Sequence, residues 1–289
     1  MGLHLGAILT AMVTPFDSRG ELDEDAAVRL MDHLLDHGSD GLVLCGTTGE
    51  APTLSDEEKL RLVRLGVQEV RTSHPGSTIV VGVGHNDTRH TVELSERVSE
   101  LRPDALLAVN PYYNKPSRRG IVRHFEAVSR ATDRPIVLYN IPQRTAQDMP
   151  NDLLKELAQI DNVAAVKQAN PANLARIDGL SIYAGNDDML ADVLDLGEPG
   201  GVLVASHLVG EEMRRMVDEP ERRHEIDARL GDVYRELAVA PLACSVKAAL
   251  SMLGLEVGGP RLPYVELEEP ERQSVRQLLE RHGLLAAAA

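Results

Sequence analysis

Short apolar segments alternate along the chain with longer segments in which apolar residues recur every three or four positions. Eight short segments are rich in Val, Ile, Leu and Ala, and they cover residues 7–12, 41–45, 78–83, 105–109, 135–139, 163–167, 181–184 and 201–205. Their apolar residues are continuous rather than alternating with polar ones, which is typical of parallel strands buried on both faces. The pattern predicts eight such strands.

Amphipathic helices are predicted between these strands. One of them places its apolar residues on a single face, at Leu60, Val63, Val67 and Val70. Ser55 and Glu58 form an S-x-x-E capping box at its start. Strand–helix alternation over this length predicts an α/β protein with a (β/α)8 TIM barrel, which occupies about 250 residues. An open doubly wound sheet is the alternative, but no G-x-G-x-x-G follows the first strand.

From about Ser206 onward the pattern is helical only. Helices are expected at residues 211–217, 222–239, 243–253 and 271–282, with Gly283 as a C-terminal cap. We therefore predict a barrel over residues 1–206 and a C-terminal helical extension over residues 207–289. The extension is expected to pack on the barrel rather than fold independently.

Composition excludes several classes of partner. The chain has 43% hydrophobic residues but only 3% aromatic ones, so the core must be aliphatic. A net charge of −15 without a basic patch argues against nucleic acid and anionic membrane surfaces. No apolar stretch reaches the ~18 residues of a membrane span, and the N-terminus does not resemble a signal peptide. Cys45 and Cys244 are expected to be reduced, buried thiols of a cytoplasmic protein.

Catalytic groups of a parallel barrel come from the C-terminal ends of the strands, so we read those ends for chemistry. The second strand precedes Gly46-Thr47-Thr48-Gly49-Glu50, a turn whose N–H groups can point at an anion. Without a following GK[ST] it is not a Walker P-loop. Taken alone, the segment is more typical of an ordinary βα turn.

Two further strand ends carry phenols. Tyr112 and Tyr113 follow the fourth strand in a proline-flanked loop, and Tyr139 ends the fifth strand, five residues before Arg144. Phenols can relay protons, and a guanidinium can bind a carboxylate through two hydrogen bonds. Taken singly, each tyrosine is more often a packing residue and the arginine a surface charge.

Lys167 ends the sixth strand, and it alone among the five lysines terminates a buried-strand pattern. The other four are placed by the pattern in polar helical segments, in a loop or in the helical extension, at Lys59, Lys155, Lys115 and Lys247. A desolvated amine loses its proton more easily, as imine formation with a ketone requires. The competing interpretation is a side chain that reaches from the strand end to solvent.

The seventh strand leads to Gly185-Asn186-Asp187-Asp188. Adjacent acids can bind a metal, but here we favour a helix N-cap formed by Asp187 and Asp188. No H-x-x-H, H-E-x-x-H or Cys cluster is present, and no Ser-His-Asp arrangement can be placed. We therefore expect neither a metal nor a cofactor.

Taken together, these motifs resemble those of one known protein family. They occur in the order T-P-F-D (residues 14–17), G-T-T-G-E, N-P-Y-Y-N-K-P, L-Y-N-I-P-x-R-T, V-K, G-N-D-D and R-L-P (residues 261–263). In order and spacing the chain resembles the dihydrodipicolinate synthase/N-acetylneuraminate lyase family of class I, pyruvate-dependent lyases, from Gly6 to about Leu267. Within that family it is most similar to the branch that condenses pyruvate with L-aspartate 4-semialdehyde, on the route to diaminopimelate and lysine.

The resemblance implies a role for each strand-end residue. Lys167 would form the imine with pyruvate, and Tyr139 would be the general acid/base beside it. Thr47 and Tyr113 would complete a proton relay, with Tyr113 contributed by a neighbouring subunit of a homotetramer built as a dimer of dimers. The residues implied to bind or line the substrates are Gly46, Thr48, Gly49, Arg144, Gly185 and Leu203.

Some positions depart from the family pattern and leave the second substrate open. Ala146 stands where Gly is frequent, Gln168 where Glu is frequent, and residues 206–209 replace T-A-N-V. Another pyruvate-dependent aldolase, acting on a 2-keto-3-deoxy sugar acid or N-acetylneuraminate, is the alternative. A barrel that binds a keto acid without turnover is a third possibility. Because Lys59 and His90 replace the His and the acid of lysine-sensitive members, we expect weak or no inhibition by L-lysine.

Overall fold

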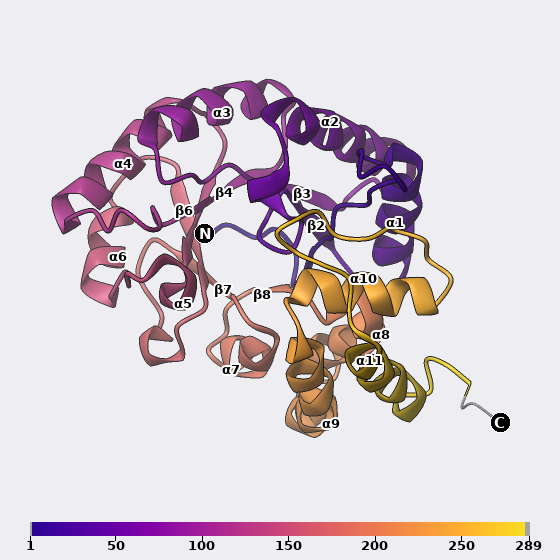
Figure 1. The fold of residues 1–289 in the computed structure, drawn as a ribbon. Coiled ribbons are helices and arrows are strands. Elements are labelled where there is room, and N and C mark those ends of the chain that lie inside the picture. Colours follow the sequence, from indigo (N-terminus) through magenta and orange to yellow (C-terminus); the bar gives the residue numbers. More distant parts are fainter. Residues whose placement is uncertain (1, 287–289) are drawn as a thin grey trace.

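The computed structural model describes residues 2–286, which form a closed eight-stranded parallel barrel (Figure 1). Each strand pairs with its neighbours in chain order, and β8 closes the barrel by pairing with β1. The strands are β1 Ile8–Ala11, β2 Gly41–Leu44, β3 Thr78–Gly82, β4 Ala105–Val109, β5 Ile136–Asn140, β6 Val163–Gln168, β7 Ser181–Ala184 and β8 Gly200–Leu203. The predicted TIM barrel is confirmed, with strand ends within two residues of those expected.

Helices surround the barrel, but one strand–strand connection lacks an α-helix. The α-helices are α1 Glu24–Asp36, α2 Asp56–Ser73, α3 Thr88–Glu100, α4 Arg118–Arg130, α5 Pro142–Thr145, α6 Asn151–Leu157, α7 Leu190–Asp195, α8 Ser206–Asp218, α9 Arg223–Glu236, α10 Leu242–Met252 and α11 Glu269–Arg281. Between β6 and β7 the chain forms only the short 3-10 helix η2, Pro171–Asn173. The expectation of a helix after every strand fails there, because a segment of so few residues that contains Pro171 and Gly179 is too short and too interrupted for one.

The core is aliphatic and continuous from the barrel interior to the strand–helix layer. In α2 the predicted apolar face is buried, and Ser55 and Glu58 form the predicted capping box. Cys45 and Cys244 are free and buried, as expected. Within residues 2–286 no helix is both long and apolar enough to cross a membrane.

The last three helices, α9 to α11, pack together against α8 beside the barrel (Figure 1). The chain turns after α11 at Gly283, whose φ of 68° is the left-handed conformation expected of a C-terminal cap. The predicted division at residues 206/207 falls within the first turn of α8, the helix that follows β8. That division remains a prediction, and residues 287–289 of the predicted extension lie outside the described range.

Candidate active site

Tyr139 and Lys167 lie side by side at the C-terminal ends of β5 and β6. They are direct partners in the ladder between these strands, so their side chains point to the same side of the sheet. The Nζ atom of Lys167 lies 4.4 Å from the centre of the Tyr139 ring. The register of two neighbouring strands therefore brings a buried amine against a buried phenol.

The absence of a close counter-ion distinguishes Lys167 from the other buried lysines. Lys59 and Lys247 are buried as well, which the sequence did not predict, but they form ion pairs with Asp56 at 3.3 Å and Glu50 at 2.7 Å. No carboxylate oxygen of residues 2–286 lies within 4.0 Å of the Lys167 Nζ atom.

The electrostatic environment of Lys167 favours a neutral amine. Burial lowers the pKa of Lys167 to about 8, because desolvation disfavours the ammonium. The negative charge of Asp187 acts against this shift, and the positive charge of Arg144 adds to it. At neutral pH the site therefore supplies a usable fraction of free amine, as the prediction from its strand-end position required.

The same burial has the opposite consequence for Tyr139. Desolvation raises the pKa of its phenol to about 12, against the charge of Arg144 and the nearby Thr47 hydroxyl, which both lower it. The phenol therefore stays protonated at neutral pH and can donate a proton to an oxygen or nitrogen atom beside Lys167.

The turn after β2 is a tight, strained structure. It is bracketed by Cys45 and Glu50, whose φ values of 55° and 57° lie in the left-handed region that non-glycine residues rarely adopt. Within the described part of the chain, no intramolecular hydrogen bond uses the N–H of Thr47 or Thr48. These two groups are therefore available to an anion.

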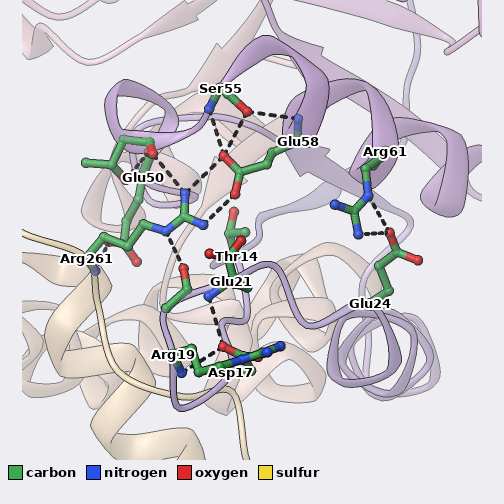
Figure 2. A network of polar contacts seen from close by, with 12 residues as sticks. Thr14, Asp17, Arg19, Glu21, Glu24, Glu50, Ser55, Glu58, Arg61 and Arg261 are labelled. Carbon is green, nitrogen blue, oxygen red and sulfur yellow. Dashed lines mark hydrogen bonds and ion pairs between the residues drawn. The ribbon is translucent and has the colours of Figure 1, made fainter.

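A network of buried charged side chains connects this turn to α2, to α10 and to the loop before α11 (Figure 2). The Glu50 carboxylate pairs with Lys247 of α10 and accepts a hydrogen bond from the backbone N–H of Arg261 at 2.9 Å. The Arg261 guanidinium binds Glu58, the capping residue of α2, and donates to the Gly20 carbonyl at 2.7 Å. The G-T-T-G-E and R-L-P motifs thus meet in one structural network, a role that the sequence analysis missed.

Gly46 and Thr47 of the turn, together with Tyr139, line a cavity of about 520 Å³ at the C-terminal end of the barrel. Arg144, on the short helix α5, lies exposed at the rim of the same cavity. Away from Tyr139 the cavity extends to Lys59, His85 and His90. The structure thus brings Gly46, Thr47, Tyr139 and Arg144 together around one cavity, whereas the predicted site residues Lys167, Thr48 and Gly49 are not among the residues that line it.

The loop that carries Arg144 is anchored by amides beneath it. The Asn140 side chain donates to Asp148 at 2.8 Å and to Gln168 at 3.0 Å, and Asn173 donates to Asp148 at 2.7 Å. Gln168, one of the departures from the family pattern, is therefore part of the support of this loop. Ala146, the other departure here, adopts a φ of 56°.

Tyr113 is the predicted relay residue that the single chain does not bring to the site. Its side chain is 87% exposed, and its φ of 72° lies in the left-handed region. The neighbouring Tyr112 lines the cavity instead. A relay through Tyr113 therefore requires a second subunit, as the resemblance implied.

Gly185 and Asp187 line a second cavity of about 570 Å³, next to the ends of β7 and β8. A side chain at Gly185 would come within 2.8 Å of the backbone at residues 168 and 169, so glycine is needed where the ends of β6 and β7 meet. Leu203 is fully buried at the end of β8 and lines neither of these two cavities.

The predicted helix cap at Asp187 and Asp188 is wrong. Asn186 holds the N-cap position of the 3-10 helix η3, Asp187–Met189, without a capping hydrogen bond from its side chain. Asp187 instead accepts hydrogen bonds from the backbone N–H groups of Val204 and Ala205. These donors come from the next strand's end, and no local sequence pattern reveals them.

Comparison with known proteins agrees with this geometry. The profile of the Dihydrodipicolinate synthetase family matches residues 4–282. The chain is 41% identical to the 4-hydroxy-tetrahydrodipicolinate synthase of Desulforudis audaxviator, over 99% of this chain and 100% of the relative. It is 40% identical to that of Synechococcus sp., over 98% and 96% of the two chains.

A solved structure shares the whole fold. DHDPS from Cyanidioschyzon merolae with lysine bound superposes with a TM-score of 0.92 at 36% identity, covering 97% of this chain and 99% of that one. The resemblance found from the motifs is confirmed over nearly the entire length. The chain belongs to the dihydrodipicolinate synthetase family.

Proposed function

We propose that this chain is a lyase that condenses pyruvate with L-aspartate 4-semialdehyde to 4-hydroxy-tetrahydrodipicolinate, through an imine at Lys167. One observation carries the proposal: a buried amine without a close counter-ion lies 4.4 Å from a buried phenol at the catalytic end of the barrel. The names of the relatives and the family profile support the same reaction.

The free amine of Lys167 adds to the ketone carbon of pyruvate, and loss of water leaves a protonated imine. This cation draws electrons from the pyruvate methyl group, which loses a proton to give an enamine. The enamine carbon attacks the aldehyde carbon, whose oxygen takes up a proton. Attack by a water or an amine then releases Lys167. Tyr139, in its protonated form, is placed to supply and recover these protons with Thr47.

The two substrate carboxylates have separate partners in this proposal. The free N–H groups of the turn, at Thr47 and Thr48, face the pyruvate carboxylate, with Gly46 and Gly49 keeping the turn tight. Arg144 binds the carboxylate of the semialdehyde at the rim. By resemblance, the backbone at Gly185 and Leu203 would lie close to the substrates, although Gly185 lines the second cavity rather than the one that Arg144 borders.

A longer substrate is the main rival, as in aldolases of 2-keto-3-deoxy sugar acids or N-acetylneuraminate. Arg144 at the cavity rim favours a short aldehyde that carries a carboxylate. We expect Arg144→Gln to raise the KM for the semialdehyde about tenfold or more, the loss of a charged hydrogen bond, while imine formation with pyruvate is retained. Faster turnover of sugar-derived 2-keto acids than of the semialdehyde would favour the rival.

The working enzyme is proposed to be a cytoplasmic homotetramer, built as a dimer of dimers. Tyr113, which is 87% exposed in the single chain, is free to make the contact with a neighbouring subunit that the resemblance implies. In the assembly it would reach the Tyr139 of the neighbouring subunit.

Trapping with borohydride tests the core of the proposal. Incubation with pyruvate and reduction should add one pyruvate-derived group to the chain, and peptide mass spectrometry should place it on Lys167. Lys167→Ala should give no adduct, while Lys59→Ala, which removes another buried lysine, should leave the adduct in place. An adduct elsewhere, or none, would refute the imine mechanism. Adduct formation without turnover of any aldehyde would indicate a keto-acid-binding protein.

Inhibition by L-lysine is expected to be weak. In the part of the cavity away from Tyr139, the carboxylate of Asp56 already binds Lys59 at 3.3 Å and His90 at 2.8 Å. The ammonium of a bound L-lysine would be repelled by the charge of Lys59, and the Asp56 carboxylate is already paired. Initial rates measured over a lysine series should stay level below millimolar concentrations, and half-maximal inhibition in the micromolar range would contradict this expectation.

A further inference from the structure

Asp148 is a carboxylate at the end of the loop that carries Arg144, and three carboxamides donate to it. Its Oδ1 atom accepts hydrogen bonds from the amides of Asn140 at 2.8 Å and Asn170 at 3.1 Å, and its Oδ2 atom accepts from the Asn173 amide at 2.7 Å. In the part of the chain that the structure describes, no lysine, arginine or histidine nitrogen lies within 4.0 Å of these oxygens. Because a carboxylate only accepts hydrogen bonds, all three amides must turn their NH2 groups toward it.

The three amides belong to two different parts of the barrel rim. Asn140 is the last residue of β5, whereas Asn170 is the N-cap of η2 and Asn173 is its last residue. The last two therefore lie in the connection between β6 and β7, which has no α-helix of its own. Asp148 thus joins the loop after β5 to the connection after β6 through side-chain hydrogen bonds.

The position of the Arg144 guanidinium depends on this loop. Among residues 2–286, no carboxylate oxygen lies within 4.0 Å of the guanidinium, so no ion pair fixes it. The loop itself is closed at its base, because the Asn140 side chain accepts from the Met149 N–H at 3.0 Å and donates to the Met149 carbonyl at 3.2 Å. Gln147 donates to the Pro116 carbonyl at 2.5 Å, in the loop after β4. The loop is therefore attached to the connections on both sides of β5.

We propose that Asp148 is a positioning residue for the second substrate, because it sets where the Arg144 guanidinium meets the semialdehyde carboxylate. The inference rests on the function proposed above, in which Arg144 binds that carboxylate. Two parallel hydrogen bonds between a guanidinium and a carboxylate require a defined distance and a shared plane. A displaced loop therefore weakens binding although both charges remain. Lys167 and Tyr139 are paired in the ladder of β5 and β6, so their geometry does not depend on Asp148.

A double-variant experiment separates positioning from a purely structural role. Asp148→Asn keeps the shape of the side chain but replaces one acceptor oxygen by an NH2 group, so at least one of the three amides then faces another donor. Asp178→Asn is the matched control, because it removes an exposed carboxylate from the same connection between β6 and β7. Arg144→Gln and the combination of Asp148→Asn with Arg144→Gln complete the set. The readouts in the full-length protein are the KM for the semialdehyde at saturating pyruvate and the rate of borohydride-trapped adduct formation with pyruvate.

Asp148→Asn should raise the KM for the semialdehyde about fivefold, because the guanidinium is displaced rather than removed. Adduct formation should stay within about twofold of the wild-type rate, and Asp178→Asn should change neither readout. The double variant should match the KM of Arg144→Gln within about twofold, because a displaced loop has no further effect once the guanidinium is gone. If Asp148→Asn does not fold, Asn173→Ala removes one of the three hydrogen bonds and should raise the same KM about twofold, with the same lack of additivity.

Three results would overturn the inference: an unchanged KM in Asp148→Asn, an equal loss in adduct formation, or effects that multiply in the double variant. In each case the wild-type protein still forms the adduct and turns over the semialdehyde, so the proposed function stands. A wild-type protein that forms no adduct, or that does not turn over the semialdehyde, would refute the proposed function instead.

Discussion

At the scale of single residues, burial has opposite effects on the two groups that meet at the ends of β5 and β6. Desolvation disfavours a charge of either sign, so it makes an amine easier to deprotonate and a phenol harder to deprotonate. Lys167 therefore gains nucleophilicity near neutral pH, while Tyr139 keeps its proton. One apolar environment supplies a base-like nucleophile and an acid without a histidine or a metal ligand.

The pKa of Lys167 predicts how the rate of imine formation falls at low pH. Below a pKa of about 8 the amine is mostly protonated, so the rate of imine formation should rise with pH, about tenfold per unit at first, and level off above pH 8. Single-turnover trapping with borohydride from pH 6 to 9 measures the rate of imine formation. A rate that is level from pH 6 upward, or that rises only above pH 10, would contradict the burial argument.

Replacement of Ala146 by glycine is expected to maintain or raise the stability of the fold, whereas a change from alanine to glycine usually lowers it. Its φ of 56° places a Cβ atom in the left-handed region, at a cost of roughly 1 kcal/mol that glycine avoids. Ala146→Gly should therefore leave the free energy of unfolding unchanged or raise it by up to about 1 kcal/mol, measured by denaturant unfolding. Ala158→Gly is the control, because Ala158 has a φ of −63° and the change should destabilise. Equal losses in both variants would show that Ala146 is unstrained.

At the scale of elements, the turn after β2 depends on a helix far away in the sequence. Lys247 of α10 and Glu50 of the turn form a buried ion pair, and Arg261 binds the same carboxylate from the loop before α11. Helix α10 thus braces the segment proposed to hold the pyruvate carboxylate. This contact gives the C-terminal extension a role in the site.

Removal of one partner of this pair should be costly. Lys247→Met leaves the charge of Glu50 buried and should lower the free energy of unfolding by about 3–5 kcal/mol, with a higher KM for pyruvate as the turn loosens. Glu50→Gln combined with Lys247→Met should recover much of the stability, because no unpaired charge then remains. Denaturant unfolding of the single and double variants tests this, and simple addition of the two losses would indicate that the groups are not coupled.

The elements that sequence reasoning predicted well are those set by local pattern. Continuous apolar segments placed all eight strands, and the position of Lys167 at a strand end placed the amine. The connection between β6 and β7 was wrong, because a helix was inferred from the alternation rather than from its own residues. The partners of Asp187 and Glu50 could not be predicted, since they come from residues 204, 205 and 247 and depend on how the barrel closes.

At the scale of the whole molecule, one member of the proposed proton relay lies outside the site of its own chain. Tyr113 lies outside the cavity that Tyr139 lines, at 87% exposure. A site made of Lys167 from one chain and Tyr113 from another would exist only in an assembly. Activity would then depend on protein concentration near the dissociation constant of that assembly.

Complementation between inactive variants tests this arrangement directly. Lys167→Ala and Tyr113→Phe should each lose activity by at least about 10²-fold, the first through its nucleophile and the second through its relay. Refolded together, they should regain a substantial part of it, because a site with Lys167 from one chain can receive an intact Tyr113 from the other. The control mixes Lys167→Ala with Tyr139→Phe, whose defects fall in the same chain's site, so no complete site can form. Recovery in neither mixture would place Tyr113 outside the relay or within its own chain, and the exposed ring would then need another explanation.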